Sequence, residues 1–213
     1  MSDEPISSNP AIDAALQLDG DPEQVRQYYA EWAQSYDRDV GEAEYSGPEI
    51  AVRLFQQACK ETSVRILDAG CGTGQVGVAL DRAGFRHIDG FDLSAEMVDI
   101  AAASGVYQTL LGDIDMMRAA EDYAVTGYDA VLSIGVFTLG HVPPEALACL
   151  LPLLNPGGLL LVSTRSHYYE QTPFQQQVDQ LLQSGRLEQL QVIWDAPYNH
   201  DGDAHYWLFR KLE

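Results

Sequence analysis

With 213 residues, the chain is long enough for one domain whose sheet is covered on both faces. Its 32 acidic residues outnumber its 12 basic residues, and the resulting net charge of −20 repels phosphate backbones and anionic lipids. Nucleic acid and membranes are therefore not expected as partners, and a sequence without a spanning apolar run or a signal-peptide pattern predicts a cytoplasmic protein.

The first part of the chain is predicted to be helical after a polar start. Residues 1–20 are turn-prone and are expected to form a disordered or loosely attached tail. Asp21-Pro22-Glu23 then combines a cap, a first-turn proline and an early acid, which predicts the start of a helix. That helix has an aromatic face built from residues three and four positions apart, namely Val25, Tyr28, Tyr29, Trp32, Ala33 and Tyr36. A second helix is expected to open at Gly47-Pro48.

From Val64 onward, strands and helices alternate. The pattern predicts strands at 64–69, 87–92, 106–111, 128–134 and 158–164, and helices at 75–83, 95–103, 143–151 and 173–184. The last two strands, 187–194 and 204–212, have only a turn-like segment between them. The predicted fold class is therefore α/β, a doubly wound and mostly parallel sheet that ends in an antiparallel hairpin.

A glycine-rich turn follows the first predicted strand. Residues 68–77 read Asp-Ala-Gly-Cys-Gly-Thr-Gly-Gln-Val-Gly, and such glycines allow backbone to approach a ligand closely. Asp92 ends the next strand, at the spacing of a ribose-binding acid. Gly72-Thr-Gly-Gln-Val-Gly77 also matches a dinucleotide fingerprint, so an NAD-dependent oxidoreductase is one hypothesis. Asp68 argues against it, because a carboxylate suits a ligand with an ammonium group and not a pyrophosphate.

Read together with Asp68, this turn resembles the first signature of class I S-adenosylmethionine-dependent methyltransferases. Four later segments stand where that family has its further landmarks: Gly90-Phe-Asp-Leu-Ser94, Gly112-Asp-Ile114, Tyr128-Asp-Ala-Val-Leu-Ser133 and Asn155-Pro-Gly-Gly158. The resemblance covers residues 64 to about 165 and implies a Rossmann-like, seven-stranded sheet, which the terminal hairpin suits. Tyr28-Tyr-Ala-Glu-Trp-Ala-Gln-Ser-Tyr-Asp37, with Gly135-Val-Phe-Thr138 and Gly140-His-Val142, is similar to the Williams-Beuren-region methyltransferase-like branch.

The resemblance implies that S-adenosylmethionine is the cofactor. Asp68 and the backbone of the glycine turn are then expected to hold the methionine amine, and Asp92 to accept the ribose hydroxyls. Asp113 is expected to accept from the adenine amine while the Ile114 amide donates to the ring, although Asp115 exchanges with Asp113 if the register differs. The other residues expected at the cofactor are Gly70, Cys71, Gly72, Gly74, Leu93, Met97 and Ser133, together with Tyr28, Trp32 and Tyr36. Residues 21–213 are interpreted as a single methyltransferase domain whose leading helices, at 21–60, cover this site.

The expected reaction is in-line displacement of the methyl group onto a small-molecule acceptor. His141, in the loop after strand 128–134, is the candidate base, although a structural or capping histidine explains it equally well. Arg165 and Tyr168 follow the fifth strand and are candidates for binding the acceptor, since an arginine can bind a carboxylate bidentately. Arg165 pairing with a surface acid is the alternative.

The cysteines, the metal-ligating residue types and the Tyr and His residues near the hairpin do not indicate a further site. Cys59, Cys71 and Cys149 are scattered and predict reduced thiols, and His, Asp and Glu show no ligand spacing, so no metal is expected. Tyr198, His200 and His205 are expected to be solvent-facing or structural. Besides the oxidoreductase, a catalytically silent nucleotide-binding domain that acts through a partner remains a hypothesis, and the oligomeric state is not predicted.

Overall fold

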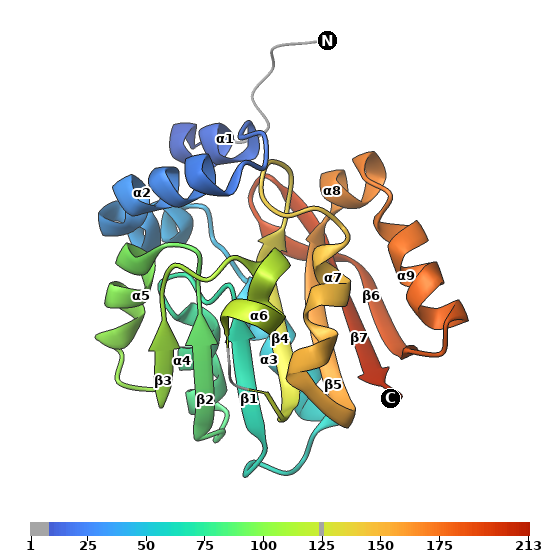
Figure 1. Ribbon diagram of the computed structural model, residues 1–213. Helices are drawn as coiled ribbons and strands as arrows, with labels where there is room; N and C mark the ends of the chain where they lie inside the picture. Colours follow the sequence, from blue (N-terminus) through green and yellow to red (C-terminus); the bar gives the residue numbers. More distant parts are fainter. Residues whose placement is uncertain (1–8, 124–125) are drawn as a thin grey trace.

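The computed structural model describes residues 9–123 and 126–213, and a seven-stranded sheet forms its centre (Figure 1). The strand order is β3-β2-β1-β4-β5-β7-β6. The strands are β1 Arg65–Ala69, β2 His87–Phe91, β3 Thr109–Leu111, β4 Tyr128–Phe137, β5 Leu154–Arg165, β6 Leu187–Asn199 and β7 Gly202–Lys211. The first five are parallel to one another, and β7 lies antiparallel between β5 and β6. The predicted α/β, doubly wound sheet with a C-terminal antiparallel hairpin is therefore confirmed.

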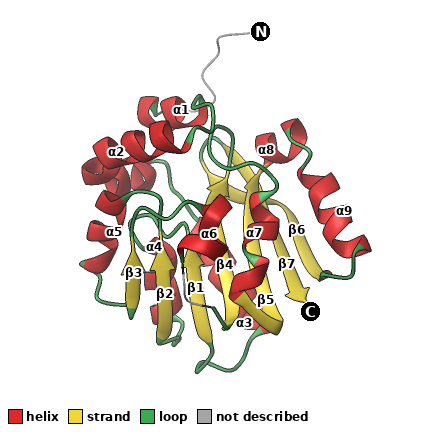
Figure 2. Cartoon of the chain, viewed as in Figure 1, coloured by secondary structure: helices red, strands yellow, loops and turns green. Residues whose placement is uncertain are grey.

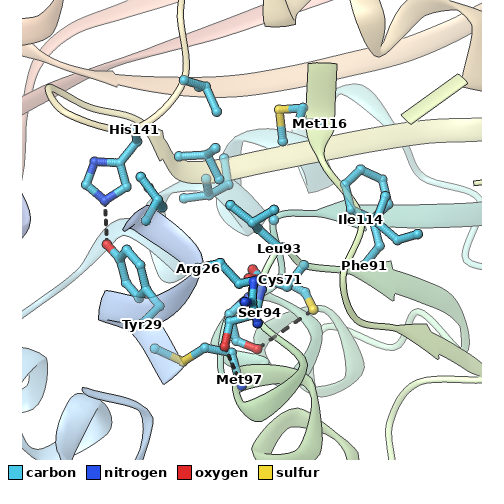
Figure 3. A pocket seen from close by; sticks show the side chains of 18 of the residues that line it. Arg26, Tyr29, Cys71, Phe91, Leu93, Ser94, Met97, Ile114, Met116 and His141 are labelled. Atoms are coloured by element: carbon cyan, nitrogen blue, oxygen red, sulfur yellow. Dashed lines mark hydrogen bonds between the residues drawn. The ribbon is translucent and has the colours of Figure 1, made fainter. Parts of the chain in front are cut away.

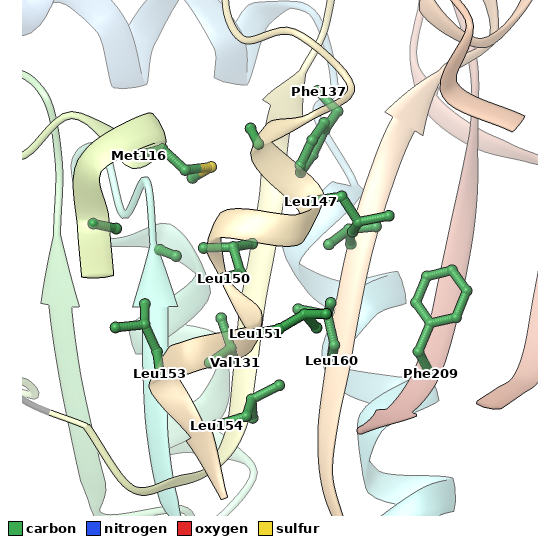
Figure 4. Close-up of a cluster of buried hydrophobic side chains, with 14 of the residues drawn as sticks. Met116, Val131, Phe137, Leu147, Leu150, Leu151, Leu153, Leu154, Leu160 and Phe209 are labelled. Carbon is green, nitrogen blue, oxygen red and sulfur yellow. The ribbon is translucent and has the colours of Figure 1, made fainter. Parts of the chain in front are cut away.

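Helices cover both faces of this sheet (Figure 2). The helices are α1 Pro10–Leu16, α2 Pro22–Glu42, α3 Gly47–Ala58, α4 Gln75–Arg82, α5 Ala95–Ala102, α6 Ala119–Asp122, α7 Ala146–Cys149, α8 Ser166–Gln171 and α9 Phe174–Gln183, with 3-10 turns η1 Met116–Arg118 and η2 Leu151–Leu153. On one face, α7, η2 and α9 pack on β4, β5 and β7 through the cluster of Figure 4, which includes Leu147, Leu150 and Phe209. On the other face, α3 and α4 contribute Leu54, Phe55 and Leu80 to a second cluster.

The segment before residue 21 differs from the expected tail. Residues Pro10–Leu16 form α1, which Asn9 caps by accepting a hydrogen bond from the Ala11 N–H at 2.9 Å. Ala15 is buried, and the Tyr28 hydroxyl of α2 donates to the Ala11 carbonyl at 2.6 Å. The prediction of a tail was therefore wrong for this part, because Asn9-Pro10 carries the same cap and proline signal as Asp21-Pro22. Residues 1–8 lie outside the described residues.

Some element boundaries also differ from those expected. The helix predicted at 143–151 is only α7, because Pro152 lacks an N–H and the chain tightens into η2. The break expected at Asn155 is a bulge inside β5, where the Asn155 amide donates to the Gly127 carbonyl at 3.1 Å. Helix α8 was not predicted, since it follows β5 directly and has no side-chain cap.

The topology points to one edge of the sheet. The strand order reverses at β1, because β2 and β3 lie on one side of it and β4 and β5 on the other. In open α/β sheets a crevice forms beyond the carboxyl ends of the strands at such a point, and ligands bind there. The long helix α2 lies across this edge in Figure 1.

Candidate active site

A pocket opens at the carboxyl edge of the sheet, where the topology places it. We call it the first pocket; its empty volume is about 1070 Å³, part of which is open solvent. The walls come from the turn after β1, the end of β2, the loop after β3, the end of β4 and helix α2 (Figure 3). Among the residues expected at the cofactor or as base, those that line it are Gly70, Cys71, Gly72, Asp92, Leu93, Met97, Ile114, Tyr36 and His141.

Asp92 organises the glycine turn. Its Oδ2 accepts a hydrogen bond from the Gly72 N–H at 2.8 Å, and its Oδ1 accepts from the Ser94 N–H at 2.9 Å. Burial raises the pKa of this carboxyl above its ordinary value, while these N–H groups favour the ionised form. Gly70 has a φ of 78°, and a Cβ there would lie 2.5 Å from Val136 Cγ2, so the turn requires glycine.

Asp68 lies outside the pocket wall, although we expected it to touch the cofactor. It is fully buried, and its Oδ2 accepts a hydrogen bond from the Tyr107 hydroxyl at 2.7 Å. Its Oδ1 is buried without a hydrogen-bond partner among the described residues. Burial raises the pKa of Asp68 to about 7. Asp68 is therefore a buried group behind the glycine turn and is not part of the pocket wall.

The loop after β3 corrects a second expectation. The Ile114 N–H donates to the Asp92 carbonyl at 3.0 Å, so it is engaged within the protein, and only the Ile114 side chain reaches the pocket. Asp113 is exposed, whereas Asp115 lines the pocket and accepts from the Met117 N–H at 2.9 Å. The alternative register, with Asp115 at the pocket, is the one that the structure has. Gly74 and Ser133 also lie away from the pocket wall.

Of the three aromatic residues of helix α2 that we expected at the cofactor, one lines the first pocket. Tyr36 lines the first pocket, but the Tyr28 hydroxyl is engaged with α1 and the Trp32 indole donates to Asp39 at 2.8 Å. Tyr29 lines the pocket and was not selected from the sequence. The helix is tied to the glycine turn because Asp37 accepts from the Thr73 hydroxyl at 2.6 Å and the Gln75 amide at 2.8 Å.

His141 lies next to Tyr29 on the wall of the pocket (Figure 3). Its Nδ1 lies 2.8 Å from the Leu139 carbonyl, and its Nε2 lies 2.6 Å from the Tyr29 hydroxyl. Because a carbonyl only accepts, Nδ1 carries the proton and Nε2 accepts from Tyr29. Burial lowers the pKa of His141 below 6.5, so the ring is neutral at pH 7. The unprotonated Nε2 of His141 is thus hydrogen-bonded to the Tyr29 hydroxyl at the pocket wall.

A second pocket, with an empty volume of about 490 Å³, adjoins the first. The residues that line both are Tyr29, Tyr36, Tyr45, Gly135 and His141. Arg165 and Trp32 line the second pocket, as does Tyr198, which the sequence suggested was solvent-facing or structural. Tyr168 was expected to bind the acceptor, but its ring is buried in the core, and its hydroxyl donates to the Val142 carbonyl at 2.9 Å. It therefore supports the loop that carries His141.

The part of the chain that the structure describes has neither a metal-binding cluster nor a membrane-spanning helix. No group of three or more His, Cys, Asp or Glu residues there is placed to hold a metal ion. No helix there is both long and apolar enough to cross a membrane.

Comparison with known sequences identifies the family. Residues 27–212 match the family described as "Methyltransferase domain". The chain belongs to this methyltransferase family. The human Methyltransferase-like protein 27 is 35% identical over 190 residues, which cover 85% of this chain and 74% of the human protein. A malonyl-[acyl-carrier protein] O-methyltransferase of Serratia marcescens is 29% identical over 195 residues, 88% of this chain and 63% of that protein.

Solved structures agree with this assignment at the level of the fold. The magnesium protoporphyrin IX methyltransferase of Synechocystis PCC 6803 with bound SAH has a TM-score of 0.68 and 16% identity, covering 89% of this chain and 99% of that one. The [4+2]-cyclase SpnF has a TM-score of 0.69 and 20% identity, covering 92% of this chain and 97% of that one. The predicted class I methyltransferase is confirmed, and the oxidoreductase hypothesis finds no support.

Proposed function

We propose that this methyltransferase transfers the methyl group of S-adenosylmethionine to a small-molecule acceptor by direct in-line displacement. The observation that carries the proposal is that the first and second pockets share one wall. Two ligands bound side by side there would meet at the residues common to both pockets. A direct displacement needs such an arrangement, because the reacting atoms have to be held in line and water excluded.

The residues of the first pocket fit S-adenosylmethionine, which supplies an electrophilic methyl group on a sulfonium. Asp92, already held by two N–H groups, would accept the ribose hydroxyls, and Gly70 and Gly72 would let the backbone approach the methionine part. Leu93, Met97 and Ile114 would pack on the adenine, with Asp115 near its exocyclic amine. The partnerless oxygen of Asp68 supports a cationic ligand, because a positive charge nearby would offset the cost of its burial.

The shared wall would bring the acceptor to the methyl carbon. The acceptor atom forms a bond to that carbon while the bond from carbon to sulfur breaks, and the electron pair stays on sulfur. The proton of a hydroxyl or amine acceptor passes to the Tyr29 oxygen as the Tyr29 proton passes to Nε2 of His141. Tyr36 and Tyr45 complete a wall that excludes water.

The relative named for ubiquinone biosynthesis supports a small acceptor, whereas another relative is named for a malonyl group on an acyl-carrier protein. The ubiquinone biosynthesis O-methyltransferase of Xylella fastidiosa is 37% identical over 109 residues, 48% of this chain and 42% of that protein. A similar fold also occurs in a protein named as a cyclase, so methyl transfer itself has to be measured.

The decisive experiment is calorimetric titration with S-adenosylmethionine, S-adenosylhomocysteine and NADH, followed by incubation of a metabolite extract with methyl-labelled cofactor. We expect both sulfur compounds to bind, NADH not to bind, and label to appear in a small product. Asp92→Ala should abolish labelling, whereas Asp99→Ala, on the exposed side of α5, serves as the matched control. Binding of NADH alone would refute the proposal, and binding without any labelled product would favour the silent domain.

A further inference from the structure

Arg165 is a buried cation without a carboxylate partner. Its relative exposure is 7%, and none of the ion pairs in the described part of the chain includes it. Six other arginines pair with acids, and all six side chains are at least 36% exposed: Arg26, Arg38, Arg65, Arg86, Arg118 and Arg210. Arg53, Arg82 and Arg186 are also in none of these ion pairs, but all three are exposed to solvent, so the buried Arg165 is the arginine that most needs an anion.

What surrounds Arg165 favours a ligand as the missing partner. The guanidinium carbon lies 4.4 Å from the centre of the Tyr198 ring, which stabilises the cation but leaves its negative partner open. Thr138 lines the same second pocket, is 7% exposed, and its Oγ1 has no hydrogen-bond partner among the described residues. A hydroxyl donor and a planar cation thus face one space.

Apart from Asn199, the rest of the second pocket is mostly apolar or aromatic. Trp32, Tyr45 and Val40 contribute to its wall, and none of the described residues that line it is an aspartate or glutamate. That composition is unusual in a protein with a net charge of −20. It suits a small molecule with a flat or apolar body and one anionic end.

We propose that the methyl acceptor is a small carboxylic acid whose carboxylate is bound by Arg165 and Thr138. This inference rests on the proposed methyltransferase function and names the substrate class of the same site. The methylated atom is a different group of the molecule, because a carboxylate paired with a guanidinium is a weak nucleophile. That second group lies at the shared wall, beside Tyr29 and His141, which supply the proton acceptor.

Binding to matched pairs of small acids and their neutral amides tests the inference. The probes are benzoate, 4-hydroxybenzoate, 4-hydroxyphenylacetate and indole-3-acetate, each with its primary amide, titrated into protein saturated with S-adenosylhomocysteine. We expect at least one acid to bind and its amide to bind at least tenfold more weakly. Affinity for the acid should fall at least tenfold in Arg165→Gln and a few-fold in Thr138→Val. Arg53→Gln, which changes an exposed arginine of α3, should bind the acid as tightly as the wild type.

The outcomes separate this inference from the proposed function. S-adenosylhomocysteine affinity is measured for every variant, and an unchanged value shows that Arg165→Gln is folded; if it is not, Thr138→Val carries the test. Failure of the wild type to bind S-adenosylhomocysteine refutes the proposed function. If that compound binds, the inference alone is overturned by equal binding of acids and amides, by unchanged acid binding in the folded variants, or by no acid binding at all.

Discussion

The two ends of the sheet differ in how completely their buried polar side chains are hydrogen-bonded. At the amino-terminal end of the parallel strands, Asp89 accepts from the Tyr128 hydroxyl at 2.8 Å and from Arg65 at 3.2 Å. Nearby, Asp129 accepts from the Arg65 N–H at 3.0 Å and from the Asn155 amide at 3.0 Å. Both acids are hydrogen-bonded to groups within the protein, so the polar groups at this end stabilise the fold.

At the carboxyl end, polar groups are left over. The buried side-chain atoms without a hydrogen-bond partner in the described residues are Asp68 Oδ1, Ser133 Oγ, Thr138 Oγ1 and the Tyr206 hydroxyl. Asp68 and Ser133 lie in the carboxyl-terminal halves of β1 and β4, Thr138 follows β4, and Tyr206 pairs with Ser163 near the end of β5. A buried unpaired group costs about 1–3 kcal/mol. Buried polar groups are thus hydrogen-bonded within the protein at the amino-terminal end of the sheet, whereas several at the carboxyl end, where the pockets lie, have no partner among the described residues.

Replacing one aspartate at each end of the sheet by alanine should give the largest difference between the two ends in ligand affinity and stability. Asp92→Ala should weaken S-adenosylhomocysteine binding at least 100-fold, since it removes two hydrogen bonds to a charged group, each contributing roughly 1.5–3 kcal/mol. It should lower the free energy of unfolding by only about 1 kcal/mol, through the freed N–H groups of Gly72 and Ser94.

Asp89→Ala should do the reverse. It leaves the Tyr128 hydroxyl and Arg65 without their acceptor, so unfolding should become easier by about 2–3 kcal/mol while ligand affinity stays within twofold. Denaturant unfolding and calorimetry on both variants measure the contrast. A loss of stability without loss of affinity in Asp92→Ala would remove the distinction between the two ends.

Asp68 should make the carboxyl end sensitive to pH. Its pKa is about 7 in the folded protein against 3.8 as the ordinary value. Between these values the unfolded chain is ionised and the folded one is protonated, so stability is lost as pH rises towards 7, at up to about 1.4 kcal/mol per pH unit. Asp68→Asn keeps an acceptor for Tyr107 and removes this slope, so its stability advantage over the wild type should grow from pH 5.5 to 7 and then level off.

The pH dependence of ligand affinity gives a second test of the Asp68 carboxyl group. A cationic amine favours ionised Asp68, so wild-type affinity for S-adenosylhomocysteine should rise up to about pH 7 and that of Asp68→Asn should stay flat. Parallel stability and affinity curves for the two proteins would mean that Asp68 carries no titrating charge in this range.

The proton route at the shared wall should affect turnover more than binding. Tyr29→Phe and His141→Gln should each lower kcat about 10- to 100-fold for a hydroxyl or amine acceptor, with cofactor affinity nearly unchanged. Because burial lowers the pKa of His141, wild-type kcat should stay constant as pH falls to 6.5 and decline only below it. Equal kcat in wild type and both variants would show that the acceptor needs no base.

The sequence predicted those site features that local geometry determines. A strand that runs into glycines and then a helix places Gly70, Gly72 and Asp92 at the carboxyl edge whatever the rest of the chain does. Asp92 follows the last residue of β2 and lines the first pocket. Asp68 lies within β1, so the alternation of the strand directs its side chain into the packed face towards Tyr107. The similar position of the two acids in the sequence concealed this difference.

Features assembled from distant segments were not predicted. Tyr29, Tyr45 and Tyr198 meet at the pockets from α2, the loop after it and the hairpin, and no periodicity relates those segments. Tyr198 falls in β6, which continues five residues beyond the predicted strand end at 194 and brings its ring over Arg165. The position of α8 shows the same limit, since only packing determines that a helix begins directly after Arg165.

Two tyrosine hydroxyls give the smallest contrast between the two ends. Tyr168 donates to the Val142 carbonyl in the loop of His141, whereas Tyr128 donates to Asp89 and also hydrogen-bonds the Tyr123 hydroxyl. Tyr168→Phe removes one hydrogen bond and should lower the free energy of unfolding by about 1–2 kcal/mol, and Tyr128→Phe removes two and should lower it by about 2–3 kcal/mol. Only Tyr168→Phe should also lower kcat, by about two- to fivefold, because it releases the loop that aligns His141 with Tyr29. Equal kcat for the two variants would mean that the loop keeps its position without the Tyr168 hydroxyl, and that packing against Phe137 and Phe174 is sufficient to hold the ring.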